Sequence, residues 1–92
     1  MMPYQLILEG KVQGVGCRYY CAKTAGAMKL NGSASNLPDG TVRVVINTDD
    51  SAKASAYAEA LRLNKFGYGF YGRFTNIKIE KCSGEIDGDY NW

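Results

Sequence analysis

The sequence predicts an α+β domain in which two helices cover one face of an antiparallel sheet. Three observations lead to this class. The chain has 92 residues, which suits one thin two-layer core. Its hydrophobic fraction of 46% and charged fraction of 22% are typical of globular proteins and exclude a disordered chain. Its segments follow the order strand, helix, strand, strand, helix, strand. We expect a single domain over residues 1–92.

The first half of the chain is expected to form a strand, a helix and a hairpin. Residues 4–9 alternate between apolar and polar side chains, which is typical of a strand. Residues 18–29 lack proline and repeat small apolar side chains at helical spacing. Strands at 33–37 and 41–46 flank Pro38-Asp39-Gly40, a strong turn sequence, and therefore pair as a hairpin. The residues expected to face the core are Ala22, Ala25, Met28, Val42, Val44 and Ile46.

The second half of the chain adds a helix and two strands. Acidic and hydroxyl side chains at 48–51 can cap a helix that runs to about residue 64. A strand at 74–81, a turn at 83–88 and a short final strand at 90–92 follow. The side chains expected to face inward are Ala56, Tyr57, Ala60, Leu61, Asn64, Ile77 and Ile79. This order is that of the split βαβ, or ferredoxin-like, fold.

Charge and residue counts exclude several kinds of function. Lys and Arg outnumber Asp and Glu by 11 to 9, and a net charge of +2 gives no argument for a polyanionic partner. The absence of histidine excludes Ser-His-Asp and Cys-His nucleophiles and histidine-bearing zinc sites. The three cysteines, Cys17, Cys21 and Cys82, indicate a reducing compartment. With no apolar span of about 20 residues and no signal peptide, we expect a soluble, cytoplasmic protein.

The segment most suited to chemistry is residues 10–18, called here the glycine loop, which leaves a strand and enters a helix. Glycines such as Gly14 and Gly16 adopt positive φ freely, which lets successive N–H groups turn inward. Such a nest at a helix N-terminus binds an anion, and the fork of Arg18 can hold two phosphate oxygens. The loop matches neither a Walker A motif, a dinucleotide fingerprint nor the cysteine phosphatase spacing. These residues leave open both an anion site and a glycine-rich turn with a surface arginine.

Two motifs together resemble the acylphosphatase family. Residues 10–18 match the signature Gly-x-Val-Gln-Gly-Val-x-Phe-Arg at every fixed position except Cys17. Residues 32–42 match Gly-x-Val-x-Asn-x-x-Asp-Gly-x-Val with Ala34 in place of Val. The resemblance is good over residues 4–64 and weak over 65–88.

The resemblance implies an enzyme that hydrolyses the carboxyl–phosphate bond of acyl phosphates to a carboxylate and inorganic phosphate, with no cofactor or metal. It implies that Arg18 binds phosphate and that Asn36 orients the attacking water. The phosphate is expected to lie against the backbone N–H groups of Gln13, Gly14, Val15, Gly16, Cys17 and Arg18. The leaving carboxylate is weakly basic, so the lack of histidine is no obstacle. We expect a monomer with a small-molecule substrate and no nucleic-acid or membrane partner.

Three residues depart from the family pattern. Cys17 replaces Phe, which predicts a differently packed loop around a buried thiol; an exposed thiol beside Arg18 would be a candidate oxidation switch. Ala34 is expected to cost some packing without touching chemistry. Arg43 stands where we expect an acidic residue in relatives, and should lie on a solvated strand face.

Residues 65–74, called here the aromatic segment, leave other functions open. Their aromatic, glycine and basic residues resemble the RNP1 pattern of RNA-recognition motifs, which would stack bases on Tyr68 and Phe70. RNP1 belongs on the third strand, however, whereas this segment follows the second helix. The segment can instead cap the end of the sheet or border the active site and contact the acyl group. A further alternative is an acylphosphatase-like module that binds an anion with little turnover, although Arg18 and Asn36 favour activity.

Overall fold

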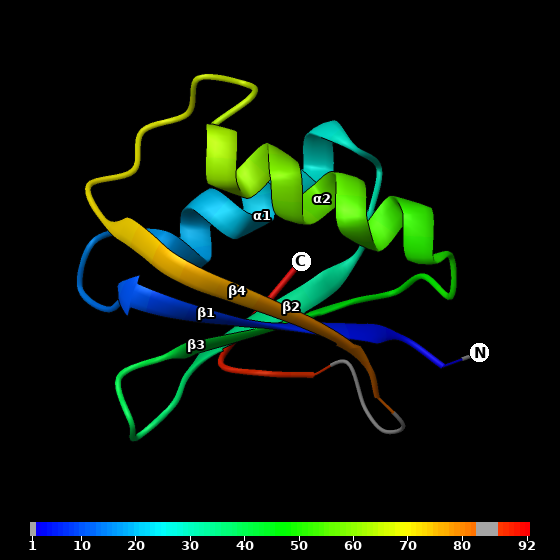
Figure 1. The fold of residues 1–92 in the computed structure, drawn as a ribbon, viewed down its shortest axis with the longest axis horizontal. Coiled ribbons are helices and arrows are strands. Elements are labelled where there is room, and N and C mark those ends of the chain that lie inside the picture. Colours follow the sequence, from blue (N-terminus) through cyan, green and yellow to red (C-terminus); the bar gives the residue numbers. More distant parts are fainter. Residues whose placement is uncertain (1, 83–86) are drawn as a thin grey trace.

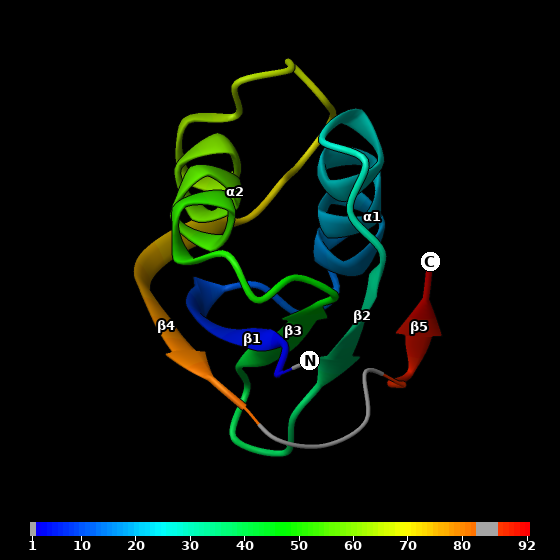
Figure 2. The ribbon, with the colours of Figure 1, turned by 90° about the vertical axis from the view of Figure 1, so that its right-hand side faces the viewer.

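The computed structural model describes residues 2–82 and 87–92 and has two layers, a sheet and a pair of helices (Figures 1 and 2). The elements are β1 (Tyr4–Lys11), α1 (Cys17–Ala27), β2 (Gly32–Asn36), β3 (Val42–Ile46), α2 (Ser51–Leu63), β4 (Arg73–Lys81) and β5 (Tyr90–Asn91). The sheet order is β4-β1-β3-β2-β5, and each neighbouring pair is antiparallel. Both helices cover the same face, which confirms the ferredoxin-like prediction. Residues 83–86 of the predicted turn lie outside the described residues.

Strand β1 lies between β3 and β4, and its end directs the chain toward the glycine loop. Leu6 and Leu8 face the helices and are fully buried, as the alternation predicts. The register with β4 shifts between Glu9 and Gly10. Gly10 has a φ of 126°, and a Cβ there would collide with the carbonyl oxygen of Arg73. This bulge therefore requires glycine where pairing gives way to the loop.

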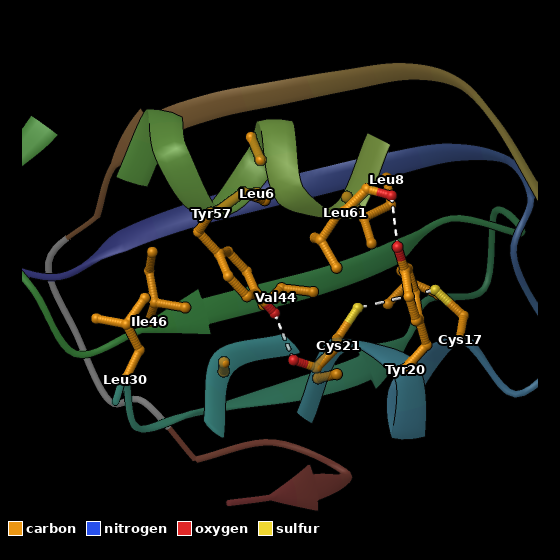
Figure 3. Packing of buried hydrophobic residues seen from close by; sticks show 14 of the residues in the cluster. Leu6, Leu8, Cys17, Tyr20, Cys21, Leu30, Val44, Ile46, Tyr57 and Leu61 are labelled. Atoms are coloured by element: carbon orange, nitrogen blue, oxygen red, sulfur yellow. Dashed lines mark hydrogen bonds between the residues drawn. The ribbon is translucent and has the colours of Figure 1, made fainter. Parts of the chain in front are cut away.

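The core lies between the sheet and the helices, and two tyrosines join the helices across it (Figure 3). The hydroxyl of Tyr20 on α1 donates to the carbonyl of Leu61 at 2.7 Å. The hydroxyl of Tyr57 on α2 donates to the carbonyl of Cys21 at 2.8 Å. Burial raises the pKa of Tyr20 to about 12 and the pKa values of Tyr57 and Cys21 well above their usual range. All three groups therefore stay neutral at physiological pH.

The predicted faces of both helices are confirmed in part: Ala25 on α1 and Tyr57, Ala60 and Leu61 on α2 are buried as expected. On α2, Ala56 and Asn64 are exposed, and Asn64 is the C-cap with a φ of 49°, beyond the last helical residue. On α1, Ala22 and Met28 are only half-buried. The core is completed by larger side chains on α1 and by Ala54 and Ala58 on α2, which lie off the predicted stripe. The buried residues are Cys17, Tyr20, Cys21, Thr24 and Ala25 on α1, and Ala54, Tyr57, Ala58, Ala60 and Leu61 on α2.

The outer strand β4 is only partly covered by α2. Ile77 packs against the core as predicted, but Ile79 retains 38% of its exposure. A cavity of about 400 Å³ lies between α2 and this strand, and both isoleucines line it. Ile79 therefore faces the helices as predicted, opposite Leu6, but stays exposed because α2 does not close over this edge strand along its whole length. No helix in the described ranges is long and apolar enough to cross a membrane.

Replacing Tyr57 with Phe tests the link between the helices. The change removes a hydroxyl whose hydrogen bond is buried but keeps the ring, so the free energy of unfolding should fall by roughly 0.5–1.5 kcal/mol. Urea unfolding measures it. Tyr71→Phe is the control, because that side chain is 86% exposed. Equal stability of Tyr57→Phe and the parent would show that the hydroxyl does not stabilise the helix pair.

Candidate active site

A cavity of about 190 Å³ opens where the glycine loop meets the end of β2. Arg18 and Asn36, from two motifs separated in the sequence, both line it. Ferredoxin-like topology brings them together because β1, which leads into the loop, and β2 run parallel with β3 between them. The full lining is Val12, Gly14, Gly16, Cys17, Arg18, Tyr19, Asn36 and Tyr90.

The glycine loop has the backbone conformation that its sequence predicts. Gly14 has a φ of 73° and Gly16 a φ of 78°. A Cβ at either position would meet no atom within 4 Å, so glycine is needed here for its dihedral freedom rather than for space. Gly16 is the N-cap of α1, and its carbonyl accepts the N–H of Tyr20 at 2.9 Å. The loop therefore passes directly into the first turn of the helix.

The electrostatics of the cavity favour an anion. The first N–H groups of a helix have no acceptor within it, and no side chain caps α1. The first turn also carries no acidic residue, and none of the acidic residues that the structure describes lines the cavity. The guanidinium of Arg18 adds a full positive charge to the positive end of the helix dipole. The backbone at the start of α1 and the side chain of Arg18 therefore both favour the binding of an anion.

Gln13 and Val15, two residues of the predicted phosphate-binding set, lie outside the cavity lining, and contacts that do not involve their backbone N–H groups anchor the loop. The amide of Gln13 donates to the carbonyls of Leu37 at 2.7 Å and Thr41 at 2.9 Å, on either side of the β2–β3 turn. Val15 is half-buried against the core, and its carbonyl accepts the N–H of Tyr71 at 3.4 Å. The other four members of that set, Gly14, Gly16, Cys17 and Arg18, line the cavity.

Asn36 ends β2 opposite Val42 and is half-buried. Its N–H donates to the carboxylate of Asp89 at 3.2 Å, and the N–H of Asp89 donates to the hydroxyl of Ser35 at 3.0 Å. The chain entering β5 thus holds the end of β2 in place. Neither bond uses the side-chain amide of Asn36, a residue that lines the cavity.

The turn in the second motif is formed by Asp39. Its carboxylate accepts the N–H of Thr41 at 3.0 Å and the hydroxyl of the same residue at 2.6 Å. These hydrogen bonds hold the pKa of Asp39 below its usual value. Asp39 does not line the cavity. Its contribution is to shape the hairpin to which the side chain of Gln13 donates its hydrogen bonds. On β3, Arg43 is half-buried and donates to Gln5 at 2.8 Å instead of lying free in solvent.

Cys17 is buried, with 2% of its surface exposed, as the sequence predicts. Its sulfur lies 3.9 Å from that of Cys21, which is fully buried as expected for a helix-packing residue. The switch interpretation required an exposed thiol beside Arg18, and this burial contradicts it.

The aromatic segment packs over the start of α1. The ring of Phe70 stacks on Tyr20 with centroids 4.7 Å apart and on Phe74 with centroids 4.9 Å apart. A Cβ at Gly72 would collide with the carbonyl of Lys11 and with Val15, so the segment lies directly against the glycine loop. It supports the loop from outside, and none of its residues lines the cavity. This arrangement fits the interpretation that the segment caps the end of the sheet. The ring of Phe70, which RNA binding would need for base stacking, is already stacked on Tyr20 and Phe74.

Sequence reasoning missed three lining residues, Val12, Tyr19 and Tyr90. Tyr19 could have been found from its place next to Arg18. Tyr90 could not, because it reaches the cavity only through the pairing of β5 with β2.

The larger cavity beside β4 is a poorer anion site, since Arg62 there is paired with Glu59 at 2.7 Å. Among residues 2–82 and 87–92, no three His, Cys, Asp or Glu side chains are grouped to hold a metal ion.

A ferredoxin-like domain whose strand-to-helix loop presents backbone N–H groups and an arginine to a cavity belongs to a class of small phosphate-handling enzymes. The sequence profile of acylphosphatases matches residues 4–88. The chain is 34% identical over 91 residues to an acylphosphatase of Bacillus licheniformis, a match that covers 96% of this chain and 91% of that protein. It is 31% identical over 83 residues to that of Lactococcus lactis, covering 90% and 86%. The chain therefore belongs to the acylphosphatase family, enzymes that hydrolyse acyl phosphates.

Solved structures agree with this assignment. The crystal structure of acylphosphatase from Bacillus subtilis superposes with a TM-score of 0.73 at 28% identity, covering 92% of this chain and 89% of that one. An acylphosphatase structure from Coxiella burnetii gives a TM-score of 0.70 at 24% identity, with 95% and 88% covered, and supports the fold.

Thiol labelling tests the buried state of Cys17. Cys82 is the one partly exposed cysteine, so a thiol reagent should modify one thiol in the native protein. Cys82→Ser should abolish rapid labelling, and urea should expose the remaining two thiols. Rapid labelling of Cys17 in native Cys82→Ser, slowed by inorganic phosphate, would instead restore the switch interpretation.

Proposed function

We propose that this chain hydrolyses acyl phosphates in the cavity shared by Arg18 and Asn36. The observation that carries this proposal is the convergence of those two side chains with the glycine loop and the start of α1 around one cavity. The loop would hold the phosphoryl group, and the end of β2 would hold the water.

Phosphate binding is assigned to the guanidinium of Arg18 and to the backbone N–H groups of residues 13–18. These donors are held in place before substrate arrives, by the positive φ of two glycines and by the anchors at Gln13 and Val15. Donors that need no rearrangement stabilise the charge that develops as the phosphoryl group transfers. Phosphoryl transfer requires mainly such positioning and electrostatic stabilisation.

The attacking water is assigned to the side-chain amide of Asn36. An amide orients a water but is too weak a base to take its proton. As the water oxygen bonds to phosphorus, the bond from phosphorus to the acyl oxygen breaks and the carboxylate leaves with the bonding pair. The water proton then passes to a phosphoryl oxygen of the substrate, so the products are a carboxylate and inorganic phosphate.

We extend the proposal to the setting in which the enzyme acts. It works as a cytoplasmic monomer on a small molecule, with no cofactor and no nucleic-acid partner. The engagement of Phe70 with Tyr20 and Phe74 supports the last point. The net charge of +2 is likewise a weak basis for binding RNA.

Arg18→Ala tests the phosphate site. Loss of a guanidinium that binds the phosphoryl group should lower kcat/KM for benzoyl phosphate, assayed with a chelator present, by roughly 10²–10³-fold or more. Inhibition by inorganic phosphate should be lost as well. Arg62→Ala is the matched control, because that arginine is exposed and paired with Glu59. A folded parent without turnover would favour the anion-binding module, and an active Arg18→Ala that phosphate still inhibits would refute the assignment.

Asn36→Ala tests the water site separately. The chemical rate should fall by about 10²-fold, as expected for loss of one preorganised polar group, while the inhibition constant of phosphate stays within about twofold. Asn47→Ala is the control, because Asn47 is exposed and follows the end of β3 that lies away from Asn36. This variant should change neither quantity. If Asn36→Ala loses phosphate binding and keeps the rate at saturation, the roles of the two residues are wrongly assigned.

A further inference from the structure

We propose that Tyr19 and Tyr90 form the acyl-group subsite of the cavity and select acyl phosphates whose acyl group is flat and apolar over the small acetyl group. This inference rests on the proposed function. It concerns the portion of the cavity that neither sequence motif accounts for: both tyrosines line it, and one comes from β5, outside both motifs.

The register of β5 places Tyr90 on the same face of the sheet as Asn36. Tyr90 lies opposite Ala34 in the antiparallel pair of β2 and β5. Ala34 is fully buried beneath the helices, and directly opposed residues share a face. Asn36 follows two positions along β2 and therefore faces the same way. The phenol ring thus stands diagonally beside the carboxamide that we assign to the water.

Tyr90 is held in this position by its neighbours. The ring of Trp92 meets it edge to face, with centroids 6.2 Å apart and an interplanar angle of 88°. The backbone of Trp92 in turn exchanges two hydrogen bonds with Gly32, at 2.9 and 3.2 Å. The ring is therefore a fixed wall, which loses little conformational entropy when a substrate packs on it.

Tyr19 supplies a second aromatic wall. It follows Arg18 in the first turn of α1 and is 57% exposed. Val12, 1% exposed, adds an apolar surface to the same cavity. Within residues 2–82 and 87–92, Arg18, which we assign to the phosphate, is the only charged side chain that lines the cavity. A charged acyl group would find no partner there, whereas a flat apolar group gains aromatic contacts and loses exposure to water.

The test compares benzoyl phosphate with acetyl phosphate. The ratio of their kcat/KM values is measured for the parent and for Tyr90→Ala and Tyr19→Ala. Benzoyl and acetyl phosphate differ in intrinsic reactivity, but that difference is common to all variants and cancels when ratios are compared. Each alanine variant should lower the benzoyl-to-acetyl ratio by roughly three- to tenfold, the size of the loss of one aromatic contact. The phosphate inhibition constant should stay within about twofold, since neither phenol is assigned to phosphate.

Two further variants separate selectivity from folding. Tyr90→Phe keeps the ring and should keep the parent's ratio. Tyr71→Ala removes an exposed tyrosine that does not line the cavity and should leave both substrates unaffected. An unchanged ratio in both alanine variants, or an equal loss for both substrates in Tyr90→Ala that Tyr90→Phe does not rescue, would overturn the subsite while leaving the proposed hydrolysis intact. Failure of the folded parent to hydrolyse either compound would overturn the proposed function itself.

Discussion

The backbone conformation of the glycine loop is the constraint on which the rest of the site depends. Gly14 and Gly16 hold positive φ values with no atom close enough to exclude a side chain, so the backbone path itself selects glycine. That path brings the chain from β1 to the uncapped start of α1 and sets Arg18 in the first turn. A loop with ordinary dihedrals would place the guanidinium and the helix N–H groups elsewhere. The cavity, and the chemistry proposed for it, would then be lost even though the sheet remained.

The family motifs contain two kinds of residue, those that line the cavity and those that hold the lining in place. Gln13 ties the loop to both ends of the β2–β3 turn, and Asp39 shapes that turn. Asp89 secures the backbone of Asn36 from the other side. The positive potential at the site arises from one arginine and a helix start, in a chain whose net charge is only +2. Function here follows from local placement of charge rather than from the charge of the whole surface.

The order of the elements was predictable from sequence, because strand alternation, turn residues and the spacing of glycines are local signals. Arg18 was a candidate from the glycine loop itself, whereas Asn36 was indicated only by the family resemblance; both line the cavity. The errors arose where the outcome depends on distant packing. The exposed fraction of Ile79 depends on how far α2 extends over β4, and the exposure of Ala56 and Asn64 depends on how α2 packs on the core. The side-chain hydrogen bonds of Gln13, which the sequence also did not predict, depend on a hairpin that folds back on it. Tyr90 reaches the cavity through a two-residue strand whose pairing partner lies more than fifty positions earlier. No local pattern contains that information.

Tyr20 participates in two contacts at once, and this has an evolutionary consequence. Its hydroxyl reaches α2, while its ring lies beneath Phe70 of the aromatic segment. A mutation at this position would loosen the helix pair and the outer support of the glycine loop in a single step. A substitution that removes the Tyr20 ring would therefore be best tolerated together with compensating changes at Phe70 and along α2. Such linked substitutions would make the three sites evolve as one unit, although they lie far apart in the gene.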